Sequence, residues 1–154
     1  MKILNTYNQQ QQQYTNFGAE IKPNLYLKKS VGHIIQNGTR EEKSFLVKVW
    51  NLITKDSTMR TFEMNMDVAS FSNKTVRYSF NIDEGKDVLF SGQPFINPSI
   101  FKDLPDKNFI VELKRFVKEH YGVKVYNDAV KSASNFKPKY VDGALAAIKK
   151  KIHQ

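Results

Sequence analysis

Two stretches of the chain alternate strictly between hydrophobic and polar residues. From Phe62 to Val68, and again from Val76 to Ile82, every second residue is apolar. A period of two is typical of strands with one buried face, so both stretches are predicted as β-strands.

The turn between these two strands follows from parity. Val68 and Phe80 both belong on the buried face, and directly opposed residues of the same face require a turn of odd length. We therefore expect a three-residue turn at Asn73-Lys74-Thr75, with Val68 opposite Phe80 and Met66 opposite Ile82. Asn73 or Lys74 is expected near the left-handed region of backbone conformation.

Further strands are predicted from shorter patterns. Phe45–Asn51 places Phe45, Val47 and Val49 on one face, and Gly32 indicates a bulge or bend. Turn signals at Asn37-Gly38 and at 83–86 bound these runs. The additional predicted strands are Leu25–Ile35, Phe45–Asn51, Asp87–Ser91 and Val123–Tyr126.

Helical signals gather after Gly92. Asn97-Pro98 is typical of a helix start, Asp106 is a candidate cap for a helix to Tyr121, and Gly122 is a stop. The predicted helices run from Asn97-Pro98 to about Leu104, from Asp106 to Tyr121, from Asn127 to Ser134, and from Asp142 to about Ile152, after a break at Lys137-Pro138-Lys139. The predicted fold is α+β: an antiparallel five-stranded barrel with C-terminal helices.

The first eighteen residues differ from the rest of the chain. They hold a run of five glutamines, Gln9 to Gln13, between Tyr7, Tyr14 and Phe17, with almost no periodicity. Such a segment gains too little apolar burial to offset its ordering entropy. We predict a flexible arm over residues 1–18 and a single domain over 19–154. The aromatic residues of the arm are candidates to join neighbouring subunits or to stack on bases, and a tail without a role is the alternative.

The charge of the chain is positive and uneven. The 154 residues carry a net charge of +9, and the segment from Lys114 to Gln154 holds 10 basic but only 3 acidic residues. A basic terminal quarter favours a polyanionic partner, with nucleic acid ahead of an anionic membrane surface or an acidic protein. The absence of an apolar run long enough for a signal peptide or a membrane span predicts a cytoplasmic protein.

Catalytic and metal motifs are missing from the sequence. There is no cysteine, the glycines form no phosphate-binding loop, and no histidine has a partner at metal-ligand spacing. Glu63 and Asp67 lie on one strand face, where a metal site or an acid–base pair is the alternative to the ordinary solvated face that we expect. We therefore expect no enzyme activity, no cofactor and no metal.

Basic and aromatic residues occur together, as single-strand binding requires. The sharpest cluster is Phe136-Lys137-Pro138-Lys139-Tyr140. For the aromatic residues a core position is the alternative; Phe136 and Tyr140 in particular could anchor the last helix. The candidate nucleic-acid-binding residues are Lys48, Trp50, Arg77, Lys124, Tyr126, Phe136, Lys137, Lys139 and Tyr140.

The strand order with a bulged first strand, over about Ile21 to Tyr126, resembles the OB-fold. With its basic and aromatic content, the chain resembles the small single-stranded-DNA-binding proteins of plasmids and phages. That resemblance implies sequence-independent coating of single-stranded DNA during plasmid transfer or replication, with self-association along the strand. The chain departs from housekeeping bacterial members, which end in an acidic tail, because its last residues include Lys149, Lys150 and Lys151.

Two functions from different classes follow. The first is binding of single-stranded DNA, or of RNA, through a basic groove with aromatic stacking. The alternative is a protein-interaction module that inhibits a host nucleic-acid enzyme, and a capsid or tail component is a third reading.

Overall fold

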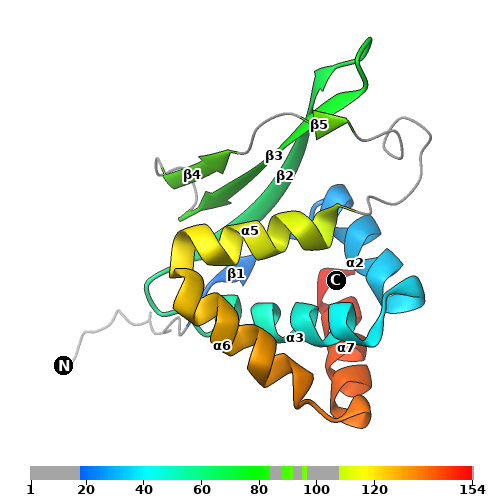
Figure 1. Ribbon diagram of the computed structural model, residues 1–154, viewed down its shortest axis with the longest axis vertical. Coiled ribbons are helices and arrows are strands. Elements are labelled where there is room, and N and C mark those ends of the chain that lie inside the picture. The colour runs from blue at the N-terminus through cyan, green and yellow to red at the C-terminus, as the bar shows by residue number, and fades with distance from the viewer. Residues whose placement is uncertain (1–17, 84–87, 92–94, 97–107, 154) are drawn as a thin grey trace, which may run out of the picture.

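The computed structural model describes residues 18–83, 88–91, 95–96 and 108–153. In these residues an open sheet packs on a layer of helices, with α5 running along the sheet (Figure 1). The strands are β1 (Glu20–Ile21), β2 (Thr61–Ser70), β3 (Thr75–Ile82), β4 (Val88–Ser91) and β5 (Phe95–Ile96). The helices are α2 (Leu25–Asn37), α3 (Arg40–Thr54), α5 (Phe109–Tyr121), α6 (Val123–Ser134) and α7 (Pro138–Ile152).

The sheet is not a barrel. Its strand order is β1-β2-β3-β4, β5 pairs with β3, and no pairing among the described strands joins β1 to β4. Among the pairings of the described strands, β1 with β2 is the parallel one, over two residue pairs, and the others are antiparallel. The structure is α+β, but the predicted five-stranded OB-like barrel is wrong, because three stretches expected as strands are helical.

The first of these stretches is α2, where a strand was expected over Leu25–Ile35. Its buried residues Leu27, Val31 and Ile34 recur at intervals of four and three, the spacing of one helix face. Asn24 caps the helix by accepting a hydrogen bond from the Leu27 N–H. Gly32 therefore lies inside a helix rather than at a bulge, whereas the break expected at Asn37-Gly38 is confirmed as the end of α2.

The second stretch is Phe45–Asn51, which lies inside α3. Thr39 and Glu42 form a capping box at its start: the Thr39 side chain accepts from the Glu42 N–H, and Glu42 accepts from the Thr39 N–H. Four of the buried residues, Phe45, Leu46, Val49 and Ile53, form a helical face. The third stretch, Val123–Tyr126, is the first turn of α6, which continues through the segment where a short helix was expected.

The β2–β3 hairpin confirms the strand predictions but not their register, and Val68, which was expected on the buried face, is 38% exposed. The observed pairs are Met64 with Phe80, Met66 with Tyr78 and Val68 with Val76, four residues away from the predicted pairing but with the same parity. The shift arises because the turn is at 71–74 and an irregularity between Val68 and Ser70 precedes it. Lys74 has φ 53°, so the left-handed residue was predicted correctly.

The helix ends near the C-terminus agree in part with prediction. α5 ends at Tyr121, and Gly122 follows with φ 97°, a conformation that favours glycine. α7 begins at Pro138 rather than at Asp142, with Pro at a position where its missing N–H has no cost. The helix expected from Asn97-Pro98 to Leu104 and the cap at Asp106 lie outside the described residues.

One core joins the sheet to the helices. Phe116 of α5 is fully buried and its ring lies 5.0 Å from that of Phe62 and 4.8 Å from that of Phe80. Val47 and Val49 of α3 and Val141 of α7 continue the same core on the helical side. The sheet therefore fixes α5, and α5 with α3 provides the base on which the remaining helices pack.

Candidate functional site

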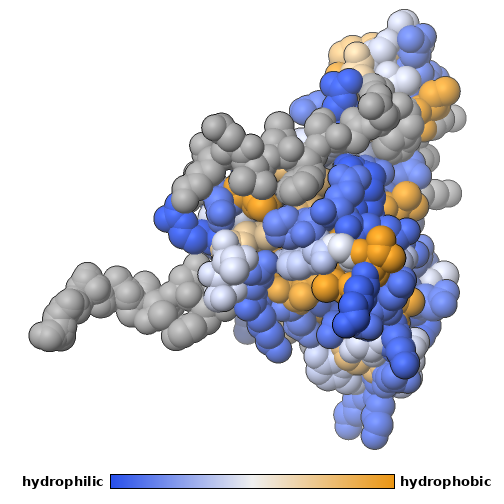
Figure 2. All heavy atoms as spheres, turned by 60° about the vertical axis from the view of Figure 1, so that its left-hand side comes forward, coloured by the Kyte–Doolittle hydropathy of each residue, from blue (hydrophilic) through white to orange (hydrophobic). Residues whose placement is uncertain are grey.

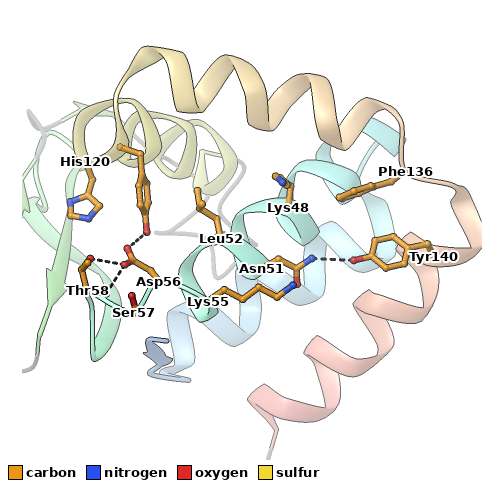
Figure 3. A pocket seen from close by; sticks show the side chains of 11 residues that line it. Lys48, Asn51, Leu52, Lys55, Asp56, Ser57, Thr58, His120, Phe136 and Tyr140 are labelled. Carbon is orange, nitrogen blue, oxygen red and sulfur yellow. Dashed lines mark hydrogen bonds between the residues drawn. The ribbon is translucent and has the colours of Figure 1, made fainter. Parts of the chain in front are cut away.

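A wide groove lies along α3, between the end of α5 and the start of α7 (Figure 3). Its volume is about 780 Å³. We call it the α3 groove; it is lined by Lys48, Asn51, Leu52, Lys55, Asp56, Ser57, Thr58, His120, Tyr121, Phe136 and Tyr140.

The α3 side of the groove follows from helical spacing. Lys48, Asn51, Leu52 and Lys55 stand at intervals of three and four residues, so they share one face of α3. The opposite side of the helix is buried in the core. The two lysines are therefore held on the solvent side of a rigid helix, one near its middle and one at its C-cap.

An aromatic wall forms one end of the groove. The rings of Phe136 and Tyr140 meet edge to face, with centroids 5.0 Å apart and an angle of 68°. Phe136 packs against the core, whereas Tyr140 is 49% exposed. The Tyr140 hydroxyl accepts a hydrogen bond of 3.1 Å from the Asn51 Nδ2, across 89 positions of the sequence. This bond holds a solvent-accessible ring beside the lysine face of α3 (Figure 3).

A hydrogen-bonded carboxylate forms the other end. The Tyr121 hydroxyl donates to Asp56 Oδ2 at 2.6 Å, and the Thr58 N–H donates to Asp56 Oδ1 at 2.9 Å. The Thr58 hydroxyl donates to the same oxygen. These bonds join the loop after α3 to the end of α5, and so hold this end of the groove in place.

The network shifts the pKa of both acids in it. Burial acts to raise the pKa of Asp56, but hydrogen bonds from Thr58 and Tyr121 and the charge of His120 outweigh burial, so this pKa is lowered. For Tyr121, burial, the bond to Asp56 and the negative charge of Asp56 all raise the pKa of the phenol. Tyr121 is thus a neutral donor, and Asp56 is an ionised acceptor whose two oxygens are engaged.

His120 completes the polar end. Its ring stacks on Phe116 with centroids 5.3 Å apart and an angle of 13°. Among the described residues, no group of three or more histidines, aspartates or glutamates is arranged to hold a metal ion. The groove therefore offers cations, an aromatic face and hydrogen-bonding groups.

Three of the residues predicted from sequence meet in this groove: Lys48, Phe136 and Tyr140. Lys137 and Lys139 are exposed beside them at the start of α7, without lining the groove. The local cluster that was singled out in the sequence is thus placed next to a lysine almost 90 positions away.

The other predicted residues lie elsewhere. Trp50 is half-buried and packs against the core, facing a small apolar cavity under β1. Arg77 is exposed on β3 opposite Asp67. Lys124 is exposed on α6, and Tyr126 is partly buried, with the Lys118 ammonium 4.5 Å from its ring centroid. Tyr7, Tyr14 and Phe17 of the arm lie outside the described residues.

Several groove residues were missed by sequence reasoning. Asn51 and Lys55 stand three and seven positions after Lys48, a spacing that places them beside it once Phe45–Asn51 is recognised as helical. Asp56 and Thr58 are joined locally, two positions apart, but the bond that brings Tyr121 to Asp56 spans 65 positions and has no local signal.

Comparison of the chain with known protein families, with curated proteins and with solved structures finds no match in any of the three. None of the described helices combines the length and the apolar character needed to cross a bilayer.

Proposed function

We propose that this protein binds single-stranded nucleic acid, DNA in the first place, in the α3 groove. One observation carries the proposal: Lys48 and Lys55 of α3 stand beside the aromatic wall of Phe136 and Tyr140 in a single open groove. Non-specific single-strand binding needs these two elements, cations for the phosphates and ring faces for the bases.

Tyr140 is the residue assigned to base stacking. It is 49% exposed, and its hydroxyl is anchored by Asn51, so the orientation of the ring is set before a ligand arrives. Stacking of one base on an aromatic side chain contributes roughly 1–3 kcal/mol. Phe136 is more buried and supports the Tyr140 ring from the side.

Lys48 and Lys55 are assigned to the phosphates. Each phosphate neutralised on a single strand contributes about −0.7 to the slope of log affinity against log salt. Two contacts thus predict a negative slope whose magnitude is at least about 1.4. Exposed Lys137 and Lys139 at the adjacent start of α7 increase the local positive potential.

A single strand suits this groove better than a duplex. A base in a duplex has both faces covered by its neighbours, so it offers no face to Tyr140 until it is unstacked. The aromatic wall is also formed at a helix junction and not by a helix that projects into a major groove.

The test is fluorescence anisotropy with a labelled oligo-dT of about 30 nucleotides, with an unlabelled duplex of equal length as competitor. Tyr140→Leu removes the ring but keeps apolar bulk, and we expect it to weaken binding about tenfold, within the range for one stacked base. Tyr140→Phe keeps the ring, loses the bond to Asn51, and is the matched control with a smaller loss.

Two results would contradict the proposal. One is the absence of oligo-dT binding at about 50 mM salt, which would direct the search to a protein partner. The other is an affinity that does not change between about 50 and 200 mM salt, since phosphate contacts require this dependence.

A further inference from the structure

A second groove runs along α2, at the contact of that helix with α7. Its volume is about 340 Å³. We call it the α2 groove; it is lined by Lys28, Lys29, Gly32, His33, Ile35, Gln36, Asn37 and Lys149.

The lining of the α2 groove is cationic. Three lysines contribute to it, two from α2 and Lys149 from the basic last turn of α7, and no Asp or Glu is among its lining residues. A concave surface lined by positive charges raises the local concentration of anions. His33 adds a ring nitrogen, 3.5 Å from the Asn37 Nδ2, and Gln36 adds a further amide.

Gly32 forms part of the wall of the α2 groove. It lies in the interior of α2, where glycine destabilises a helix relative to alanine. A Cβ built at this position meets no atom within 4 Å, so packing among the described residues does not require glycine. A glycine that packing does not need, in the wall of a basic groove, leaves the backbone bare where a ligand can approach closely.

We infer that the α2 groove binds phosphate groups of the nucleic-acid strand, as a contact separate from the α3 groove. This inference rests on the proposed function, because it assigns a second part of the same ligand. Tyr140 and Lys149 are nine residues apart on α7, about 14 Å along the axis and half a turn around it at 1.5 Å and 100° per residue. An oligonucleotide of about 30 nucleotides is long enough to reach both grooves, at about 3.4 Å for each nucleotide.

The decisive variant is Gly32→Gln, which fills the groove without changing its charge. Glutamine is a good helix former and meets no protein atom at its Cβ, so the melting temperature should stay at or above that of the wild type. We expect oligo-dT of about 30 nucleotides to bind at least about threefold more weakly at low salt. Gly143→Gln is the matched control, because Gly143 is also an interior helix glycine with an open Cβ but lines neither groove.

A charge variant tests the same inference by another route. Lys28→Gln with Lys29→Gln should reduce the magnitude of the salt slope by about 1.4, the value for two phosphate contacts. Lys74→Gln, on the distant hairpin turn, should leave the slope unchanged. Either wild-type affinity for oligo-dT in Gly32→Gln or an unchanged slope in the double variant would overturn the inference.

The outcomes separate this inference from the proposed function. If Tyr140→Leu weakens oligo-dT binding and Gly32→Gln does not, the α3 groove is the interface and the α2 groove is not part of it. If the wild type does not bind oligo-dT at all, both fail. Linear inorganic polyphosphate supplies the same phosphate chemistry from another source: a loss with Gly32→Gln for polyphosphate alone would overturn the assignment to nucleic acid.

Discussion

The helices and the hairpin of this protein differ in charge although they share one core. The helices lie within residues 25–55 and 109–153, which contain 16 basic and 6 acidic residues. The hairpin and the loop before it lie within residues 56–83, which contain 3 basic and 4 acidic residues. Both candidate grooves are formed mainly by helical residues. Hydrophilic side chains cover much of the helical part on the face in Figure 2, with hydrophobic patches between them. The difference teaches that the sheet supports the fold, whereas the basic surface on which ligand binding is proposed belongs mainly to the helices.

The two regions depend on each other through α5. The buried face of the hairpin contributes Phe62 and Phe80, and Phe116 of α5 contacts both rings. The Arg115 guanidinium lies 5.4 Å from the Phe80 ring centroid and is paired with Glu112 at 2.9 Å and with Glu119 at 2.7 Å. We therefore expect the helices and the hairpin to unfold together.

The largest predicted effect follows from removing this joint. Phe116→Ala leaves a cavity where two other rings meet, and it should lower the free energy of unfolding by about 3–5 kcal/mol. Urea unfolding monitored by far-UV circular dichroism and by Trp50, which is the one tryptophan, should give coincident transitions in the wild type. A hairpin that unfolds in a separate transition would contradict the shared core.

The hairpin was predictable from sequence because one of its faces packs on the core and the other is exposed to solvent. Alternation from Val76 to Ile82 matches that geometry, whereas in β2 only Phe62 and Met64 of the apolar set are fully buried and Val68 is exposed. The parity of the pairing was predicted correctly even though the register moved by four residues. The register depended on the position of the turn, and the irregularity before Ser70 had no signal in the pattern of hydrophobic residues.

The helices were misassigned because β-branched residues and a coincidence of spacing suggested strands. Phe45, Val47 and Val49 alternate, yet Leu46 is buried with them, which no strand with one exposed face permits. The sequence Thr39 to Glu42 held the better signal, a capping box directly before the apolar run. Weighing that cap against the alternation would have predicted α3.

The candidate site was predictable only in its local half. Phe136, Lys137, Lys139 and Tyr140 are neighbours in sequence, so their basic and aromatic composition predicts a nucleic-acid-binding cluster without knowledge of the fold. The bond from Asn51 to Tyr140 and the bond from Tyr121 to Asp56 depend on how distant helices pack. Such contacts follow from the tertiary fold, which was predicted as a barrel.

The next prediction concerns charge in the two regions. Lys55→Glu places a negative charge in the α3 groove and should weaken oligo-dT binding about tenfold at low salt, equivalent to about 1.4 kcal/mol. Lys74→Glu makes the same change at the hairpin turn and should alter the affinity less than twofold. Equal losses in the two variants would show that net charge, and not the groove, determines binding.

A smaller effect is expected at the polar end of the α3 groove, where Tyr121 donates to Asp56. Tyr121→Phe removes one donor from Asp56 and should lower the free energy of unfolding by about 1 kcal/mol at pH 7. Because the folded pKa of Asp56 is lowered, the stabilisation is present above the unfolded pKa of about 3.9 and is lost as pH falls through the folded pKa. The difference between wild type and variant should therefore shrink below about pH 4 in urea unfolding. A difference that stays constant down to about pH 2 would show that Asp56 is not the acceptor that matters.

The smallest effect separates stability from binding at the hairpin turn, which extends beyond the helices in Figure 1. Lys74 has φ 53°, a conformation that costs less for glycine, so Lys74→Gly should raise the free energy of unfolding by about 0.5 kcal/mol. Asn73→Gly is the control, because Asn73 has no positive φ and gains only unfolded-state freedom. Oligo-dT affinity should not change in either variant, although Lys74→Gly removes a positive charge. A measurable loss of affinity would place the hairpin within the interface, and would contradict the proposal that the helices alone bind the ligand while the sheet stabilises the fold.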